Sequence, residues 1–551
     1  MKKIIAIFLF MTMFFAGCED FLDTENLTEK DTSNYPESQA EIMNLLTGVY
    51  AATRAMEMDE NARCAFVVAE VLSDDRFGGG GPDDKDWANL EKFICSDPNM
   101  FRNTWSNAYR SIFRANMLLN SLDMVEWSDE TTRSYVEGQV YFLRAYSYFY
   151  LARLFGTAPL TLSPDPVNLP RASAEELFAQ IGNDLKTAIE KMPNTPKVAE
   201  RGRASKWAAQ ALMARAYLFY TGYYKKENMP LPEGGSISRT EVIAYLDDCI
   251  ANSGYNLYPD FRNLWPYSNA LSKRDGYPFS VNNGLQWAGE SGENYETVFA
   301  FQSAAKITWS NVADCNRINL YFSPREQDEA GIFPYGKGWG FGPVNPKLWD
   351  AWPQSDLRKK GSVIDVEDKE NEMPDYMWAA DHQQHESGYW QKKYIAVNIK
   401  RNGGYTNYSK EMYGDLVNDD YQINNTQDLV IFRFADILLM VAELKQDAEP
   451  LNKVRARAGL EPVAYSENAL RNERRWEFAF EGVRYYDLLR WGIAGEALDS
   501  QNGVEIMNDG ATGRMDIGNQ AARIAETGGF MPIPEAEIEL SGGLLEQTPG
   551  W

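Results

Sequence analysis

Apolar residues recur at helical spacing over residues 38–225. The segments EIMNLLTGVYAATRAM and WSNAYRSIFRANMLLNSLDMV each place their large apolar residues on one broad stripe, as amphipathic helices do. Two later segments resemble each other, because Arg144-Ala145-Tyr146 recurs as Arg215-Ala216-Tyr217. The two copies lie about two 34-residue tetratricopeptide units apart. This pattern predicts divergent tetratricopeptide-like helix pairs, and chance similarity between two helices rich in Ala and Tyr is the alternative.

The pattern changes at residue 226. Residues 226–432 are rich in Gly, Pro, Asn and Trp, which predicts a loop-rich region with one helix at 238–252 and a strand in ETVFAFQ. Helices resume in 433–551, in RFADILLMVAELKQ and ALRNERRWEFAFEGVRYYDLLRWG. The predicted fold is therefore mainly α, with a helical scaffold and a loop-rich half that has few short strands. Loops held on such a scaffold are where binding residues tend to lie.

The N-terminus has the pattern of an export signal. Two lysines precede an apolar run of about a dozen residues, which is too short to span a bilayer as a mature helix. Small residues then lead into Cys18, so that residues 1–17 are predicted to be a lipoprotein signal peptide and Cys18 the lipid anchor. An ordinary secretory signal with an incidental cysteine is the alternative. Residues 18–37 are polar and are predicted to form a tether, and their first acidic residues resemble a surface-export signal of Bacteroidetes lipoproteins. We therefore expect the protein in the outer membrane, facing the cell exterior.

Composition and charge limit the classes of ligand and partner that the protein is expected to bind. The chain is 44% hydrophobic and 24% charged, which is typical of a globular protein, and its net charge is −25. Such a surface repels nucleic acid and anionic lipid headgroups, and it suits a neutral ligand. No two cysteines form a C-x-x-C pair, so zinc and redox motifs are not expected. Free buried thiols are the interpretation that we favour, and the sequence leaves open any pairing among Cys64, Cys95, Cys249 and Cys315.

The chain offers little of the chemistry that enzymes use. Its two histidines, His382 and His385, lie in DHQQHES, which is not a metalloprotease motif. We interpret this segment as a solvated polar one, with metal binding by the two histidines and the neighbouring acidic residues as the alternative. No histidine neighbours a G-x-S-x-G-like turn, so no Ser-His-Asp site is predicted. A pair of carboxylates of the kind that glycosidases use is not excluded, because acidic residues are plentiful.

The segment VLSDDRFGGGGPDDKDW (71–87) combines four glycines with five aspartates. It lacks the G-K-[ST] ending of a phosphate-binding loop, and its carboxylates would repel phosphate. Calcium is an alternative because aspartates supply hard oxygen ligands, although their spacing departs from a standard calcium loop. A mobile surface loop and a sugar-contacting loop are the other interpretations. The aspartates in question are Asp74, Asp75, Asp83, Asp84 and Asp86.

Several phrases, in a fixed order, resemble the SusD/RagB family of outer-membrane lipoproteins. NERRWEFAFEGVRYYDLLRWG (472–492) is similar to the family signature, and SDDRF, RAYSYFYLARLFGTAPL, RFADILLMVAEL, LNKVRARAGL and the ending FMPIPEAEIELSGGLLEQTPGW are also typical of it. The resemblance extends from Cys18 to Trp551. On the signature helix, Arg474, Glu477 and Glu481 are spaced to form local charge pairs, which we interpret as stabilising the fold rather than as a reaction site.

The resemblance implies a non-enzymatic, cofactor-free glycan-binding lipoprotein that delivers oligosaccharide or polysaccharide to a SusC-like TonB-dependent transporter. A RagB-like peptide-binding protein is one alternative, and a glycoside hydrolase is another. Family members bind their ligand with a shallow arc of aromatic and polar side chains from two loop regions. By region, these correspond to Asp75, Arg76, Trp87, Trp287, Trp309, Tyr321 and Trp339. We expect Trp87, freed by the glycine run, to form a platform with Trp309 or Trp339.

Overall fold

The computed structural model describes residues 35–58, 63–165, 167–195, 202–292 and 294–551. The predicted signal peptide, Cys18 and most of the predicted tether lie outside the described residues. No helix in the described part of the chain has the length and apolar character that crossing a bilayer requires.

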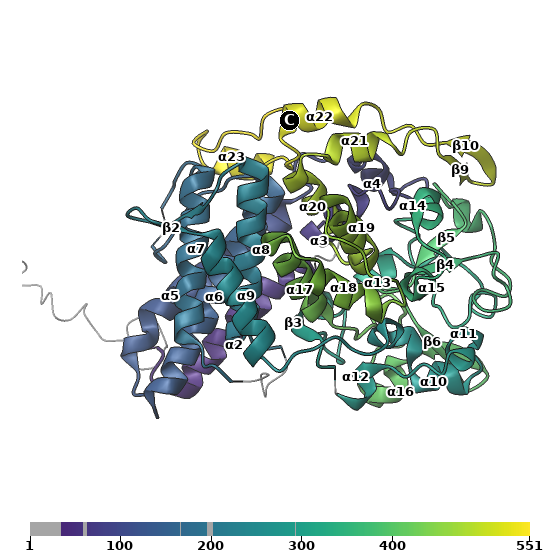
Figure 1. The fold of residues 1–551 in the computed structure, drawn as a ribbon, viewed down its shortest axis with the longest axis horizontal. Coiled ribbons are helices and arrows are strands. Elements are labelled where there is room, and N and C mark those ends of the chain that lie inside the picture. The colour runs from purple at the N-terminus through teal and green to yellow at the C-terminus, as the bar shows by residue number, and fades with distance from the viewer. Residues whose placement is uncertain (1–34, 59–62, 166, 196–201, 293) are drawn as a thin grey trace, which may run out of the picture.

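The first part of the chain folds into helices that stand side by side (Figure 1). Each of them packs on its neighbours in the order α2, α5, α6, α7, α8 and α9. At the starts of α7 and α9, Ser173 and Ser238 each form a capping box with the glutamate three residues later. The helix predicted at 238–252 is thereby confirmed. The helices in this part of the chain, including the shorter α3, α4 and η2, are α2 (Gln39–Glu57), α3 (Ala65–Val71), α4 (Lys85–Leu90), α5 (Arg102–Ser121), η2 (Leu122–Met124), α6 (Glu130–Phe155), α7 (Ala174–Lys191), α8 (Lys206–Tyr224) and α9 (Arg239–Asn252).

The two similar segments that suggested a repeat lie in α6 and α8. In each copy the arginine forms a buried ion pair with an aspartate of another helix: Arg144 with Asp184 at 2.7 Å, and Arg215 with Asp436 at 2.5 Å. The small alanines between the aromatic residues are fully buried, which lets these helices approach closely. The similarity of the two segments thus reflects a shared packing role.

The middle of the chain consists of loops, short helices and two-stranded antiparallel sheets. The strand predicted in ETVFAFQ is β3, and it pairs with β8, which directly precedes α17. The sheets are β1 (Met229–Pro230) with β2 (Ser236–Ile237), β3 (Thr297–Phe301) with β8 (Leu429–Arg433), β4 (Val363–Asp365) with β5 (Tyr389–Gln391), β6 (Asn398–Arg401) with β7 (Gly404–Asn407), and β9 (Glu505–Asn508) with β10 (Ala511–Arg514). The short helices are η3 (Phe261–Leu264), η4 (Pro266–Ser268), α10 (Ala270–Arg274), α11 (Pro278–Asn282), α12 (Ala288–Ser291), η5 (Val312–Asp314), α13 (Ile318–Tyr321), α14 (Pro346–Ala351), α15 (Leu357–Ser362), η6 (Ala380–His382), α16 (Ser409–Tyr413) and η7 (Gly414–Leu416).

Helices α17 to α20 lie between the helical part and the loop-rich part (Figure 1). The end of the chain then runs across the top of the view, from β9 and β10 to α23 above α7. One continuous apolar core extends from α2 to the C-terminal residues. The helices are α17 (Phe434–Lys445), α18 (Ala448–Arg457), α19 (Glu467–Phe478), α20 (Arg484–Trp491), α21 (Ala494–Asp499), α22 (Gln520–Thr527) and α23 (Glu535–Leu540).

The charged residues of the signature helix α19 have partners other than those predicted. Arg474 pairs with Asp436 of α17 and Asp487 of α20, at 2.9 and 2.7 Å. Glu477 binds arginines from three other segments, among them Arg358 at 2.9 Å. The expectation of local pairs along the helix was wrong, because the helix is covered by neighbours that supply the opposite charges.

Candidate functional site

The acidic start of the glycine-rich loop is buried. Asp74 pairs with Arg484 at 2.7 Å, and Asp75 pairs with Arg475 at 2.6 Å. Arg76 is fully buried and pairs with Glu70 at 2.7 Å. The structure therefore corrects the assignment of Asp75 and Arg76 to a ligand surface: their charges are neutralised inside the protein, where an unpaired charge would be costly.

The glycine run packs against a second glycine-rich segment, residues 338–342. The amide of Gly80 donates to the carbonyl of Gly340 at 2.8 Å, and the amide of Gly342 donates to the carbonyl of Gly78 at 3.0 Å. A Cβ atom on Gly79 would lie 2.6 Å from the carbonyl oxygen of Gly340. The glycines are therefore needed for close backbone approach, and the loop is packed rather than a mobile surface loop.

Trp87 is part of the core. Only 4% of its surface is exposed, and its ring lies 5.7 Å from that of Phe341. Its burial rules out the predicted swing onto a ligand in this structure. Tyr321 is likewise buried, with its ring 5.3 Å from Trp339. The sequence could not separate these core aromatic residues, which lie in the short helices α4 and α13, from exposed ones, because local sequence does not show which side chains the fold covers.

Two of the predicted tryptophans lie close to one buried arginine, Arg317. Trp309 is 54% exposed, and Trp339 is partly buried. The guanidinium of Arg317 lies 5.6 Å from the ring centre of Trp309 and 4.9 Å from that of Trp339. It also lies 5.6 Å from Tyr321, four residues later on the chain. We call Trp309, Arg317 and Trp339 the aromatic face. Arg317 was not predicted as a site residue. The only local feature that links it to the site is its four-residue, helical spacing to Tyr321.

Lys337, two residues before Trp339, belongs to a small polar cluster. Lys337 pairs with Glu326 at 2.7 Å, and the hydroxyl of Tyr421 donates to Glu326 at 2.9 Å. Burial, together with that hydrogen bond, raises the pKa of Tyr421, so its hydroxyl stays protonated at neutral pH. Aromatic rings beside such groups can stack on the C–H face of a sugar while its hydroxyls are hydrogen-bonded.

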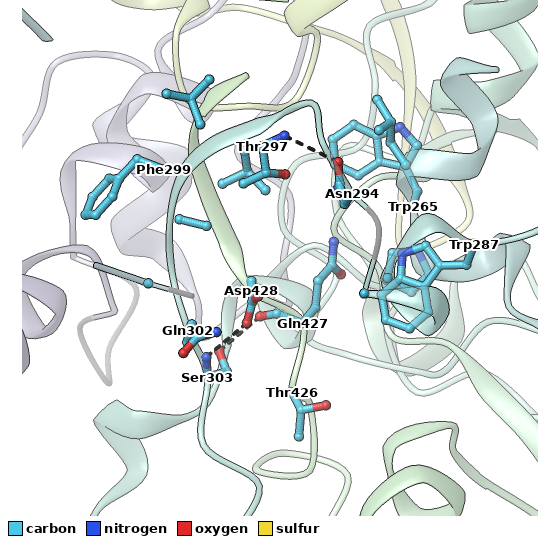
Figure 2. Close-up of a pocket in the computed structure, with 18 of the residues that line it drawn as sticks. Trp265, Trp287, Asn294, Thr297, Phe299, Gln302, Ser303, Thr426, Gln427 and Asp428 are labelled. Carbon is cyan, nitrogen blue, oxygen red and sulfur yellow. Dashed lines mark hydrogen bonds between the residues drawn. The ribbon is translucent and has the colours of Figure 1, made fainter. Parts of the chain in front are cut away.

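Trp287 lines a pocket of about 350 Å³. Figure 2 shows Trp287 on one side of this pocket and Gln302 with Ser303 on the other, with Gln427 and Asp428 between them. The Trp287 ring is held edge-on against Tyr408, with the ring centres 5.4 Å apart. We call this cavity the Trp287 pocket. It adds a concave site to the open aromatic face.

The described residues hold no group of three or more His, Cys, Asp and Glu side chains placed to bind a metal ion. The aspartates proposed as calcium ligands are mostly engaged: besides the pairs of Asp74 and Asp75, Asp84 binds Arg325 and Asp86 binds Arg63, both at 3.0 Å. Cys95, Cys249 and Cys315 form no disulfide among the described residues. Cys64, Cys249 and Cys315 are buried as expected, whereas Cys95 is only partly buried.

The two histidines have different environments. His382 is exposed and contacts Asp509 at 3.0 Å, in agreement with a solvated segment. His385 is largely buried, and its Nδ1 atom accepts a hydrogen bond from the amide of Gly79 at 3.2 Å. The expectation of a solvated side chain was therefore wrong for His385, which is packed against the glycine run.

Comparisons with known proteins identify the family. Residues 20–218 match the profile of a SusD-like family described as starch-binding and associating with the outer membrane, and residues 325–551 match that of the SusD family. A SusD-like protein of Formosa agariphila is 22% identical over 542 residues, which cover 89% of each chain.

Solved structures share the fold. A laminarin-binding SusD-like protein superposes with a TM-score of 0.69 at 25% identity, covering 94% of this chain and 100% of the other. Surface glycan-binding protein A from Bacteroides thetaiotaomicron, in complex with laminarihexaose, gives 0.71 at 21% identity, covering 93% and 99%. Together the two profiles cover most of the chain, and the shared fold extends over nearly all of it. The chain therefore belongs to the SusD/RagB family.

Proposed function

We propose that this protein captures neutral glycans at the cell surface and passes them to a SusC-like TonB-dependent transporter, without catalysing a reaction. Similar proteins bind laminarin and laminarihexaose, and one matching family is described as starch-binding and associating with the outer membrane. The net charge of −25 favours a neutral ligand over an anionic one. The lipid on Cys18 would hold the protein at the outer membrane.

The aromatic face is the observation that carries this proposal. Trp309 is 54% exposed, and the guanidinium of Arg317 lies 5.6 Å from its ring centre and 4.9 Å from that of Trp339, within the range of cation–π contacts. Two indole rings fixed by a common cation offer a preorganised stacking surface, which lowers the entropic cost of binding. A shallow face of this kind binds weakly, and a high local concentration at the membrane would compensate for that.

Removing the tryptophans tests the proposal. We expect Trp309→Ala and Trp339→Ala each to weaken laminarihexaose binding about tenfold, because each removes one stacking surface worth ~1.4 kcal/mol. Isothermal titration calorimetry of the purified protein measures this change. Trp378→Ala is the matched control, since Trp378 is also exposed, at 39%, and lies outside the aromatic face.

Unchanged affinity in both aromatic-face variants would contradict the assignment of the face. Binding of peptides but of no glycan across a mixed panel would favour a RagB-like peptide binder instead. Release of reducing ends from laminarin by the purified protein would contradict a purely binding role.

The lipid anchor is tested by fractionation. We expect Cys18→Ser to move the protein out of the membrane fraction, because the thiol that would carry the lipid is lost. Retention of this variant in the membrane fraction would argue against the anchor at Cys18.

A further inference from the structure

The Trp287 pocket and the aromatic face are joined by one short segment, residues 425–428. At one end, the carbonyl of Asn425 accepts a hydrogen bond from the amide of Asn316, the residue before Arg317, at 3.2 Å. At the other end, Asp428 accepts one from the amide of Ser303 at 3.3 Å, and it lines the pocket together with Thr426 and Gln427. An extended chain advances about 3.3 Å per residue, so the segment between these two contacts spans only about 10 Å.

The pocket offers unengaged amide groups. The Asn294 side-chain oxygen accepts from the amides of Glu296 and Thr297 at 3.1 and 3.3 Å, which leaves its Nδ2 group without a hydrogen-bond partner among the described residues. The side-chain amide of Gln302 also lacks a partner among them, and Figure 2 places it across the pocket from Trp287. Both amides can bond to hydroxyl groups of a ligand.

The charged side chains that line the pocket sum to zero net charge. Arg203 supplies one positive charge and Asp428 one negative charge, and the other polar lining groups are neutral. With a volume of about 350 Å³, the pocket is near the lower end of the range for small-molecule sites, roughly 300–1,000 Å³. It therefore suits a compact, neutral, hydroxyl-rich group that can rest against an indole.

We propose that the Trp287 pocket receives a single-sugar side branch of a neutral glycan whose main chain lies on the aromatic face. This inference rests on the proposed glycan-binding function and narrows the ligand class to branched neutral glycans. The open face can take the side of a chain, whereas the pocket has room for only a small group beside it. In this arrangement Asn294 and Gln302 determine specificity: their amides recognise the branch and not the main chain.

Two probes that differ only in a branch test the inference. One is laminarihexaose, and the other is the same hexasaccharide with one 6-linked glucose. We expect the wild-type chain to bind the branched probe about tenfold more tightly in calorimetric titration. Gln302→Leu and Asn294→Asp are each expected to abolish this gain and to leave the affinity for laminarihexaose unchanged.

The variants are chosen to preserve the fold. Asn294→Asp keeps the oxygen that accepts the two backbone hydrogen bonds and replaces the Nδ2 donor by a negatively charged oxygen that can only accept. Gln286→Ala is the matched control, because Gln286 is an exposed amide next to Trp287 that does not line the pocket. It should keep the full gain for the branched probe.

Equal affinity of the wild-type chain for both probes would overturn the branch proposal and leave glycan binding intact. So would a gain that persists in both pocket variants. A loss of laminarihexaose affinity in those variants would also overturn it, because it would place a chain end in the pocket. If neither probe binds, both the proposed function and this inference fail.

Discussion

Glu91 and His385 show how individual side chains hold the glycine run in place. Glu91 is buried, and its carboxyl accepts a hydrogen bond from the amide of Gly78 at 2.5 Å. Burial raises the pKa of Glu91 to about 8 and lowers that of His385 to about 4. Both side chains are therefore mainly uncharged at neutral pH. Because His385 accepts the Gly79 amide through Nδ1, its ring proton lies on Nε2.

Replacing Glu91 by glutamine should change how stability depends on pH. Between pH 4.5 and pH 8, folded Glu91 holds a proton that the unfolded chain has released. This group therefore lowers the free energy of unfolding by about 1.4 kcal/mol per pH unit as the pH rises. Glu91→Gln has no such proton, so we expect it to gain stability relative to wild type from pH 5 to pH 8 in urea unfolding. His385 contributes the opposite slope below pH 6.5, equally in both proteins. A stability difference that does not change with pH would contradict the buried neutral carboxyl.

At single residues, the sequence does not show which side chains are buried or with which distant residues they pair. Trp309 and Trp339 both lie close to Arg317, but nothing local distinguishes them from the buried Trp87. Asp75 resembles a ligand-binding carboxylate until its partner is known, and that partner, Arg475, is 400 residues away in the sequence. Burial and long-range pairing are properties of the fold, and neither appears in a local pattern.

At the scale of elements, local signals gave reliable predictions. The capping serine of α9 and the short apolar run of β3 are local features of a few residues, so the sequence displays them directly. The structural role of the glycine run could not be predicted from the sequence. Its partner segment, residues 338–342, is itself rich in glycine, but only the structure shows the backbones pairing through Gly79 and Phe341.

The close approach of these two segments predicts unequal costs for two glycine substitutions. Gly79 and Gly403 both have positive φ, at 69° and 82°, so alanine is strained at either position. A Cβ on Gly79 would in addition lie 2.6 Å from the Gly340 carbonyl oxygen, whereas nothing lies within 4 Å at Gly403. We expect Gly403→Ala to cost about 1 kcal/mol and Gly79→Ala at least 1–2 kcal/mol more, measured by urea unfolding. Equal costs would show that the two segments are not packed as closely as the structure shows.

At the scale of the whole molecule, a buried ionic network joins the loop-rich middle to the C-terminal helices. Arg433, at the end of β8, contacts Glu296 at 2.6 Å, Glu477 at 2.7 Å and Glu481 at 2.8 Å. Glu296 directly precedes β3, while the other two glutamates belong to the signature segment around α19. The family signature thus places charges where distant segments meet, which explains why it marks a fold and not a reaction.

Removing the centre of this network should destabilise the protein as one unit. Arg433→Met leaves three buried carboxylates short of a positive charge, so we expect a loss of about 3–5 kcal/mol. Arg471→Met is the matched control: its pair with Glu467 is largely solvated, and its loss should cost about 0–1 kcal/mol. Because one apolar core spans both parts, tryptophan fluorescence and far-UV circular dichroism should report the same urea midpoint in each variant. Separate midpoints in Arg433→Met would show that the ionic network, and not the shared core, is what couples the helical scaffold to the loops that carry the aromatic face.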